Sequence, residues 1–160
     1  MADKHTQEEL NLDAKVTVKN IAAWNVGFAR ISDGYGDVNI APNGSIRLSR
    51  NEIMAQVQNG NKLFCGINGA GSHATLYVDD EPTRKELDFD NEDGPQMVFF
   101  NLDLKRLFEY KRQDAFEREF KKWIVTRAEK MAIMEAMKAA KVNDYAKIRF
   151  AEEYTGYKFQ

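Results

Sequence analysis

The spacing of hydrophobic residues changes near Gly94, and this change limits the folds open to the chain. Before Gly94, β-branched and aromatic runs alternate with turn residues, and the clearest runs are KVTVK, WNVGFARI, GDVNI and SIRLS. After Gly94 the period is helical, and DAFEREFKKWIV carries a stripe made of Phe116, Phe120, Trp123 and Ile124. We therefore predict an α+β fold, in which a small antiparallel β-sheet or barrel-like N-terminal part precedes a C-terminal helical module.

One helix is expected among the predicted strands, at about residues 50–59. Ser49 and Glu52 have the spacing of a capping box, in which each side chain bonds the other residue's backbone N–H. Ile53, Met54 and Val57 fall at helical spacing, and Gly60 suits the end of a helix.

The C-terminal part carries similar signals. Thr126 and Glu129 form a second capping box before KMAIMEAMKAAK. Asn143 is expected to cap the next helix, which ends at Gly156. The preceding segment, MVFFNLDLKRLFEY, fits a strand followed by a helix or a helix alone.

The chain divides into four parts. They are a polar arm at 1–14, a β-rich domain at 15–80, an acidic linker at 81–95 and the helical module at 96–160. The arm lacks the basic and apolar blocks of a secretory signal, and no apolar run approaches the roughly 20 residues of a membrane-spanning helix. We therefore expect a protein made in a cytoplasm, without a membrane partner.

Eight acidic residues lie between Asp79 and Asp93, which raises the question of a calcium site. An EF-hand loop that began at Asp88 would place Asp93 where glycine is needed and Phe99 where glutamate is needed. We therefore expect no metal here, only a hydrated linker in which Thr83 and Glu86 cap one short helical turn.

The segment LFCGINGAGSHATLYVDD contains GAGSHA, which fits a loose dinucleotide-binding pattern. Such a loop needs a helix after it, whereas HATLYVDD has the composition of a strand. A hairpin is the better interpretation, and we predict no cofactor. Its register places Leu63, Cys65, Ala74, Leu76 and Val78 on a core face, and Lys62, Phe64, His73, Thr75 and Tyr77 on the outer face.

This register separates Cys65 from His73, so it argues against a nucleophilic pair. Cys65 is the only cysteine, and the only other histidine is His5, so neither a disulfide nor a zinc centre rich in cysteine or histidine is expected. We predict that the protein is not an enzyme.

Nucleic-acid binding is the alternative function. Residues 1–93 hold 9 Lys/Arg against 15 Asp/Glu, a net charge of −6, while residues 94–160 hold 14 against 10, a net charge of +4. The basic candidates lie on the last two helices: Arg127, Lys130, Lys138, Lys141, Lys147 and Arg149. Acidic residues such as Glu135 and Glu152 interrupt this stripe, which favours a solvated surface.

Three segments resemble small virion-associated proteins of tailed bacteriophages. They are WNVGFARISDGYGDVNIAPNGSIRLSRNEIMAQVQNGNKLFCG, GSHATLYVDD and NDYAKIRFAEEYTGYKF. The resemblance covers most of the chain and includes no catalytic motif. It implies a phage setting, with synthesis in the host bacterial cytoplasm and a place in the virion.

The expected function is a non-enzymatic structural or assembly role, such as decoration, cement or adaptor. The partner would be a capsid, portal or tail protein at the capsid or the head-tail junction, with the chain present in several copies. Candidate contact residues are Arg47, Arg50, Lys62, His73, Tyr77, Trp123, Met131, Met134 and Met137.

Overall fold

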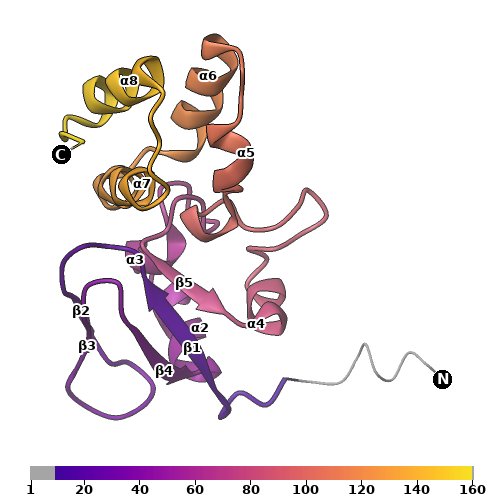
Figure 1. The fold of residues 1–160 in the computed structure, drawn as a ribbon. Coiled ribbons are helices and arrows are strands. Elements are labelled where there is room, and N and C mark those ends of the chain that lie inside the picture. The colour runs from indigo at the N-terminus through magenta and orange to yellow at the C-terminus, as the bar shows by residue number, and fades with distance from the viewer. Residues whose placement is uncertain (1–9, 160) are drawn as a thin grey trace.

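The structure, a computed structural model, describes residues 10–159 and has the predicted α+β class (Figure 1). Strands and short helices form one end of the molecule, and the C-terminal helices form the other. The strands are β1 Lys15–Asn20, β2 Val26–Ala29, β3 Asp37–Ile40, β4 Ser45–Ser49 and β5 Leu76–Asp79. The helices of the N-terminal half are α2 Arg50–Gln58, α3 Lys62–Cys65 and α4 Glu81–Glu86. A 3-10 turn, η1 Phe99–Asn101, then precedes α5 Leu104–Phe108, α6 Gln113–Trp123, α7 Arg127–Ala139 and α8 Tyr145–Thr155.

The main sheet is antiparallel and has the order β4-β1-β5. In its register Val18 lies opposite Ile46 on one side and Val78 on the other. Alternate residues of β1 are buried, so one face of the strand packs into the core, as the sequence alternation predicts. Strands β2 and β3 form a separate antiparallel pair. The four predicted strand runs before residue 50 are confirmed.

Helix α2 begins where the sequence predicts, because the Ser49 hydroxyl accepts a hydrogen bond from the Glu52 N–H at 3.0 Å. The second bond of the expected capping box, from the Ser49 N–H to the Glu52 carboxylate, does not form. The Glu52 carboxylate is fully buried and instead accepts backbone N–H bonds at 2.8 to 3.2 Å from Ile31, Ser32 and Asp33. One buried carboxylate therefore fixes the β2–β3 loop against α2.

The hairpin predicted for residues 62–78 is wrong in its first half. Residues 62–65 form the helical turn α3, because the Asn61 side chain accepts a hydrogen bond from the Leu63 N–H at 3.0 Å and caps it. A tight loop follows, in which a Cβ atom on Gly66 would clash with the Ser72 carbonyl oxygen. Only the second half is a strand, and β5 pairs with β1. No helix begins at Ser72, so the outgoing strand is confirmed.

This change corrects the expected faces. Cys65 is buried as predicted, but Phe64, His73 and Tyr77, which we placed on the outer face, are buried too. Phe64 packs into the first hydrophobic core. Because α3 is helical, the strand alternation of a hairpin does not apply to Phe64. Tyr77 is buried because β5 is covered on both of its faces.

The acidic segment is more structured than a hydrated linker. Asp80, rather than Thr83, caps helix α4. Thr83 lies within the helix, and its side chain is buried. Arg50 bonds Asp80 at 3.0 Å, and Arg84 bonds Asp90 at 2.9 Å. Both ion pairs are mostly shielded from solvent, and Arg84 also donates to the Val78 carbonyl of β5 at 2.9 Å. The Arg50–Asp80 pair therefore fixes the segment to α2, and Arg84 fixes it to β5.

The C-terminal helices enclose a second hydrophobic core. The predicted stripe on α6 supplies it, with Phe116, Phe120 and Ile124 fully buried and Trp123 half-buried. Of the two alternatives for residues 97–110, the start is not a strand, because this stretch turns through η1 into α5. Helix α8 is capped by Asp144 rather than Asn143, and it ends at Gly156 as predicted. Among residues 10–159, no helix has the length and hydrophobicity required to cross a membrane.

The buried Glu52 carboxylate predicts acid sensitivity. Burial would raise its pKa, but the hydrogen bonds from Asp33, Gln56, Ile31 and Ser32 outweigh burial and lower the pKa below the ordinary value of 4.5. A lowered folded-state pKa stabilises the fold above pH 4.5, and this contribution is lost as the pH falls through the folded-state value. We expect Glu52→Gln to lower the free energy of unfolding by about 2–4 kcal/mol at neutral pH and to flatten its decline below pH 4.5, measured by denaturant titration.

Glu86→Gln is the matched control, because Glu86 is exposed on α4. It should change the free energy of unfolding by less than about 0.5 kcal/mol. An acid-dependence of Glu52→Gln that matches the wild type would contradict the role of this carboxylate.

Candidate functional site

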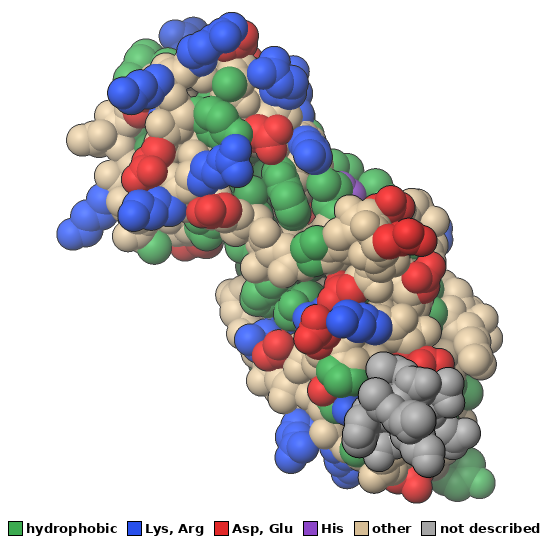
Figure 2. Space-filling view, turned by 90° about the vertical axis from the view of Figure 1, so that its right-hand side faces the viewer, with side chains coloured by type: hydrophobic (Ala, Val, Ile, Leu, Met, Phe, Trp, Pro, Cys, Tyr) green, Lys and Arg blue, Asp and Glu red, His purple; other side chains and the backbone are tan. Residues whose placement is uncertain are grey.

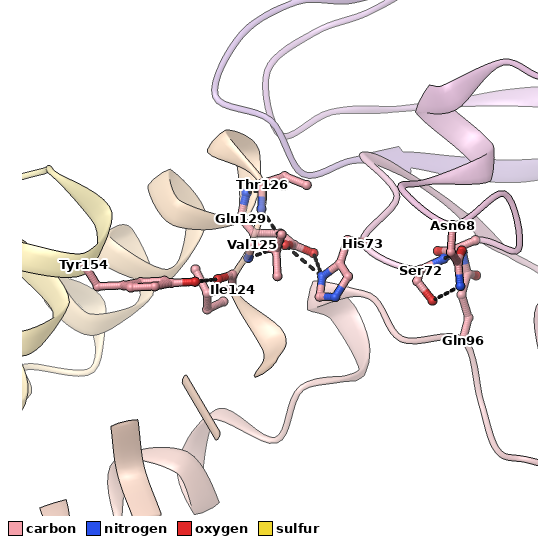
Figure 3. Close-up of polar contacts among 10 residues, drawn as sticks. Asn68, Ser72, His73, Gln96, Ile124, Val125, Thr126, Glu129 and Tyr154 are labelled. Carbon is pink, nitrogen blue, oxygen red and sulfur yellow. Dashed lines mark hydrogen bonds and ion pairs between the residues drawn. The ribbon is translucent and has the colours of Figure 1, made fainter. Parts of the chain in front are cut away.

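Helix α7 contributes Ala128 to the first hydrophobic core and Ile133 to the second, and between these two residues it carries the buried side chain of Glu129 (Figure 3). The predicted capping box is fully formed: the Thr126 hydroxyl accepts from the Glu129 N–H at 3.2 Å, and the Glu129 side chain accepts from the Thr126 N–H at 3.0 Å. Glu129 also accepts from the Val125 N–H at 2.9 Å. Its carboxylate therefore closes the α6–α7 turn.

His73 reaches the same carboxylate from the N-terminal half. Its ring nitrogen Nδ1 lies 2.9 and 3.0 Å from the two Glu129 carboxylate oxygens. The side chains of His73 and Glu129 are 7% and 0% exposed, so solvent hardly screens this contact. Because Glu129 is acceptor-only when ionised, Nδ1 carries the proton, and the other ring nitrogen, Nε2, is left for other partners.

The backbone at His73 is shaped for this contact. His73 has a φ of 60°, in the left-handed region that few side chains adopt. Its N–H donates to the Met97 carbonyl at 2.7 Å, which holds the loop against the segment before η1. The loop before it is closed by Asn68, whose side chain accepts from the Ala70 N–H and donates to the Ser72 hydroxyl (Figure 3). The glycine-rich stretch thus positions the imidazole.

A pocket of about 420 Å³ lies beside His73. Its walls come from α3, the glycine loop, the residue before β5 and the N-terminus of α7: Asn61, Lys62, Leu63, Gly66, Ile67, His73, Thr75 and Thr126. Two of the predicted contact residues, Lys62 and His73, therefore share one site. We call it the histidine pocket.

A second hollow, which we call the apolar groove, lies between the end of the sheet and α7. Its volume is about 410 Å³, and its lining is Asn20, Ile21, Ala23, Asn43, Phe99, Phe100, Met131, Ala132, Glu135, Ala136 and Ala139. Phe100 is 42% exposed, yet it is held in place by stacking on Tyr77 at 5.0 Å between ring centroids. Met131, a predicted contact residue, is half-buried and lines the groove, whereas Tyr77 does not line it and contacts the groove residue Phe100 by stacking.

Other predicted contact residues are placed elsewhere or are not accessible. Met134 and Met137 are 2% and 0% exposed, so their assignment to a binding surface is wrong: they fill the second core. Trp123 lies in a separate hollow between α5 and α6. Arg47 is exposed and donates to the Lys15 carbonyl at 2.8 Å, whereas Arg50 is held by Asp80.

One residue of the nucleic-acid alternative is contradicted. Lys147 is 5% exposed, and its Nζ donates to the Phe108 carbonyl at 2.7 Å, so it is not available to phosphates. Arg127 lies over the Trp24 ring, Lys130 lies over the Tyr154 ring, and Arg149 pairs with Glu153. These three, together with the half-buried Lys138 and the exposed Lys141, stay predictions.

Figure 2 shows Lys and Arg side chains over the α5–α6 end of one face of the molecule. Acidic side chains lie between them, and acidic side chains are frequent lower on the same face.

Cys65 and His73 have different hydrogen-bond partners, and neither contacts the other as a nucleophilic pair would require. Its thiol donates to the Val57 carbonyl at 3.6 Å, while the bonded nitrogen of His73 faces Glu129. Burial raises the pKa of the Cys65 thiol, which lowers the fraction of reactive thiolate. Among residues 10–159, no three His, Cys, Asp or Glu side chains are grouped closely enough to hold a metal ion.

Comparison with protein-family models, with curated proteins and with solved structures finds no match to this chain. The resemblance to phage proteins therefore stays a prediction.

The contact between His73 and Glu129 is the part of the site that the sequence did not reveal. The two residues are 56 positions apart, and the hairpin register placed His73 on the outer face. The sequence signal that located the Glu129 carboxylate was the capping box, which predicts that this carboxylate lies at the start of α7. It gave no indication of the histidine partner.

We expect the His73–Glu129 contact to stabilise the fold. A double-mutant cycle with His73→Gln and Glu129→Gln should give a coupling energy of about 1–3 kcal/mol in denaturant titrations. Glu135→Gln, an exposed change on the same helix, is the control and should cost less than about 0.5 kcal/mol. A coupling energy indistinguishable from zero would mean that the two side chains act independently.

We also expect Cys65 to be unreactive in the folded protein. An aromatic disulfide reagent should modify it at least about 100-fold more slowly in buffer than in denaturant, because the thiol is buried and protonated. Absorbance of the released thiolate measures both rates on this single cysteine. Equal rates would contradict the burial of the thiol.

Proposed function

We propose that this chain is a non-enzymatic assembly protein of a tailed bacteriophage that binds the capsid or the head-tail junction. The apolar groove between the sheet and α7 is the observation that carries the binding role. The phage setting rests on the resemblance of the sequence segments described above.

The groove has the properties of a protein-binding anchor site. Phe100 presents a large aromatic surface to solvent, and its stacking on Tyr77 reduces the conformational entropy that binding would cost. Lys19 lies 5.7 Å from the centre of the Phe100 ring and places a charge beside the apolar surface. Apolar anchors of this kind are filled by one or two side chains of a partner.

The opposite wall of the groove is compliant. Met131 is unbranched and can adapt its shape, while Ala132, Ala136 and Ala139 allow a partner to approach the α7 backbone closely. A site of this size is small for a stable complex in solution. On a particle, many copies act together, so that a weak contact per copy suffices.

Sedimentation with purified particles, heads and tails of the source phage tests the proposal. The wild-type chain should bind saturably to one of them. Met131→Glu and Ala139→Lys place opposite charges in the groove, and each should weaken binding at least about tenfold, equivalent to about 1.4 kcal/mol. Because the charges differ in sign, a loss in both variants cannot come from long-range electrostatics.

Ala140→Lys is the matched control, because Ala140 is the C-cap residue directly after Ala139 but lies outside the groove. It should bind like the wild type. Failure of the wild-type chain to associate with particles or their subunits would refute the proposal. A salt-sensitive mobility shift with DNA or RNA, reduced by Arg149→Glu, would instead support the nucleic-acid alternative.

A further inference from the structure

The histidine pocket shares no lining residue with the apolar groove, and it combines polar and apolar walls. One side of it is apolar, made by Leu63 and by Ile67, which is 61% exposed. The other side is polar, made by Lys62, His73 and the hydroxyls of Thr75 and Thr126. Such a division fits a ligand that has one charged end and one apolar end.

His73 has one ring nitrogen free for this ligand. Nδ1 is occupied by Glu129, and among residues 10–159 no group forms a hydrogen bond with Nε2. His73 is 7% exposed and lines the pocket, so an unpartnered nitrogen on a nearly buried ring is available there. The Glu129 contact and the backbone bond to Met97 hold the ring in a fixed orientation.

Lys62 supplies the positive charge. Its side chain is exposed, forms none of the ion pairs found among residues 10–159, and comes from the first position of α3. The charged and titratable groups that line or directly back the pocket are Lys62 on α3, His73 in the loop and Glu129 on α7. Because Glu129 lies directly behind His73, a ligand with two negative charges is disfavoured relative to one with a single charge.

We propose that the histidine pocket binds a carboxylate carried on an apolar group. Lys62 Nζ and the protonated His73 Nε2 donate to the carboxylate, while the apolar group lies against Leu63 and Ile67. Nε2 donates to the carboxylate when both ring nitrogens of the imidazole carry a proton. The carboxylate belongs either to the C-terminus of a peptide or to a small carboxylic acid. This site is independent of the assembly role, because its residues lie outside the apolar groove.

Calorimetric titration with N-acetyl-leucine tests the proposal in the full-length protein. N-acetyl-leucinamide, which has the same apolar group and no charge, is the matched ligand and should bind at least about tenfold more weakly. Lys62→Gln should weaken N-acetyl-leucine at least about fivefold, whereas Lys111→Gln, an exposed change in the loop before α6, should have no effect.

The source of the carboxylate is decided by a further titration. A tetrapeptide that ends in leucine should bind at least about tenfold more tightly than N-acetyl-leucine if the partner is a protein C-terminus, and equally if it is a small acid. Equal affinity for the amide, equal affinity in Lys62→Gln, or equally tight binding of inorganic phosphate would each overturn the proposal. Met131→Glu, which disrupts the apolar groove, should bind N-acetyl-leucine normally, so the two proposals can fail separately.

Discussion

The carboxylate of Glu129 holds together segments that are distant in the chain. It closes the turn between α6 and α7 through the N–H groups of Val125 and Thr126, and it receives His73 from the N-terminal half. Ala128, on the same helix, packs into the first core, while Ile133 and Met137 pack into the second. The buried Glu129 side chain and these apolar contacts together orient α7, and this helix and its N-cap residue form part of the walls of both proposed binding sites.

Local signals in the sequence predicted much of the fold. The alternation of β1, the cap of α2 and the capping box of α7 all depend on residues within a few positions of each other, and each is present in the structure. The hairpin failed for a related reason. Asn61 can cap a helical turn, and this local bond competes with strand formation in a run whose alternation alone favours a strand. Propensity over four residues is too weak to decide between the two.

The candidate sites could be predicted only in part, because their geometry depends on contacts across long stretches of sequence. Lys62 and His73 were both proposed as contact residues, but nothing local indicated that a loop would bring them into one pocket with Thr126. Glu52 and Glu129 illustrate the same limit. Each was identified from capping-box spacing, yet the Glu52 carboxylate caps a loop 19 to 21 residues earlier, and Glu129 binds a histidine 56 residues earlier. Capping rules predict one backbone N–H that a carboxylate accepts from. They do not predict which groups bond its remaining lone pairs.

The order of the main sheet has a consequence for synthesis. The central strand, β1, is the first to leave the ribosome, yet its two neighbours, β4 and β5, end at residues 49 and 79. Until β5 emerges, one edge of β1 has no pairing partner within the sheet, and its exposed backbone groups could pair with another nascent chain. The polar side chains Lys15, Thr17 and Lys19 alternate with its valines, which makes such an edge less adhesive. The sequence of β1 thus serves the growing chain as well as the finished sheet.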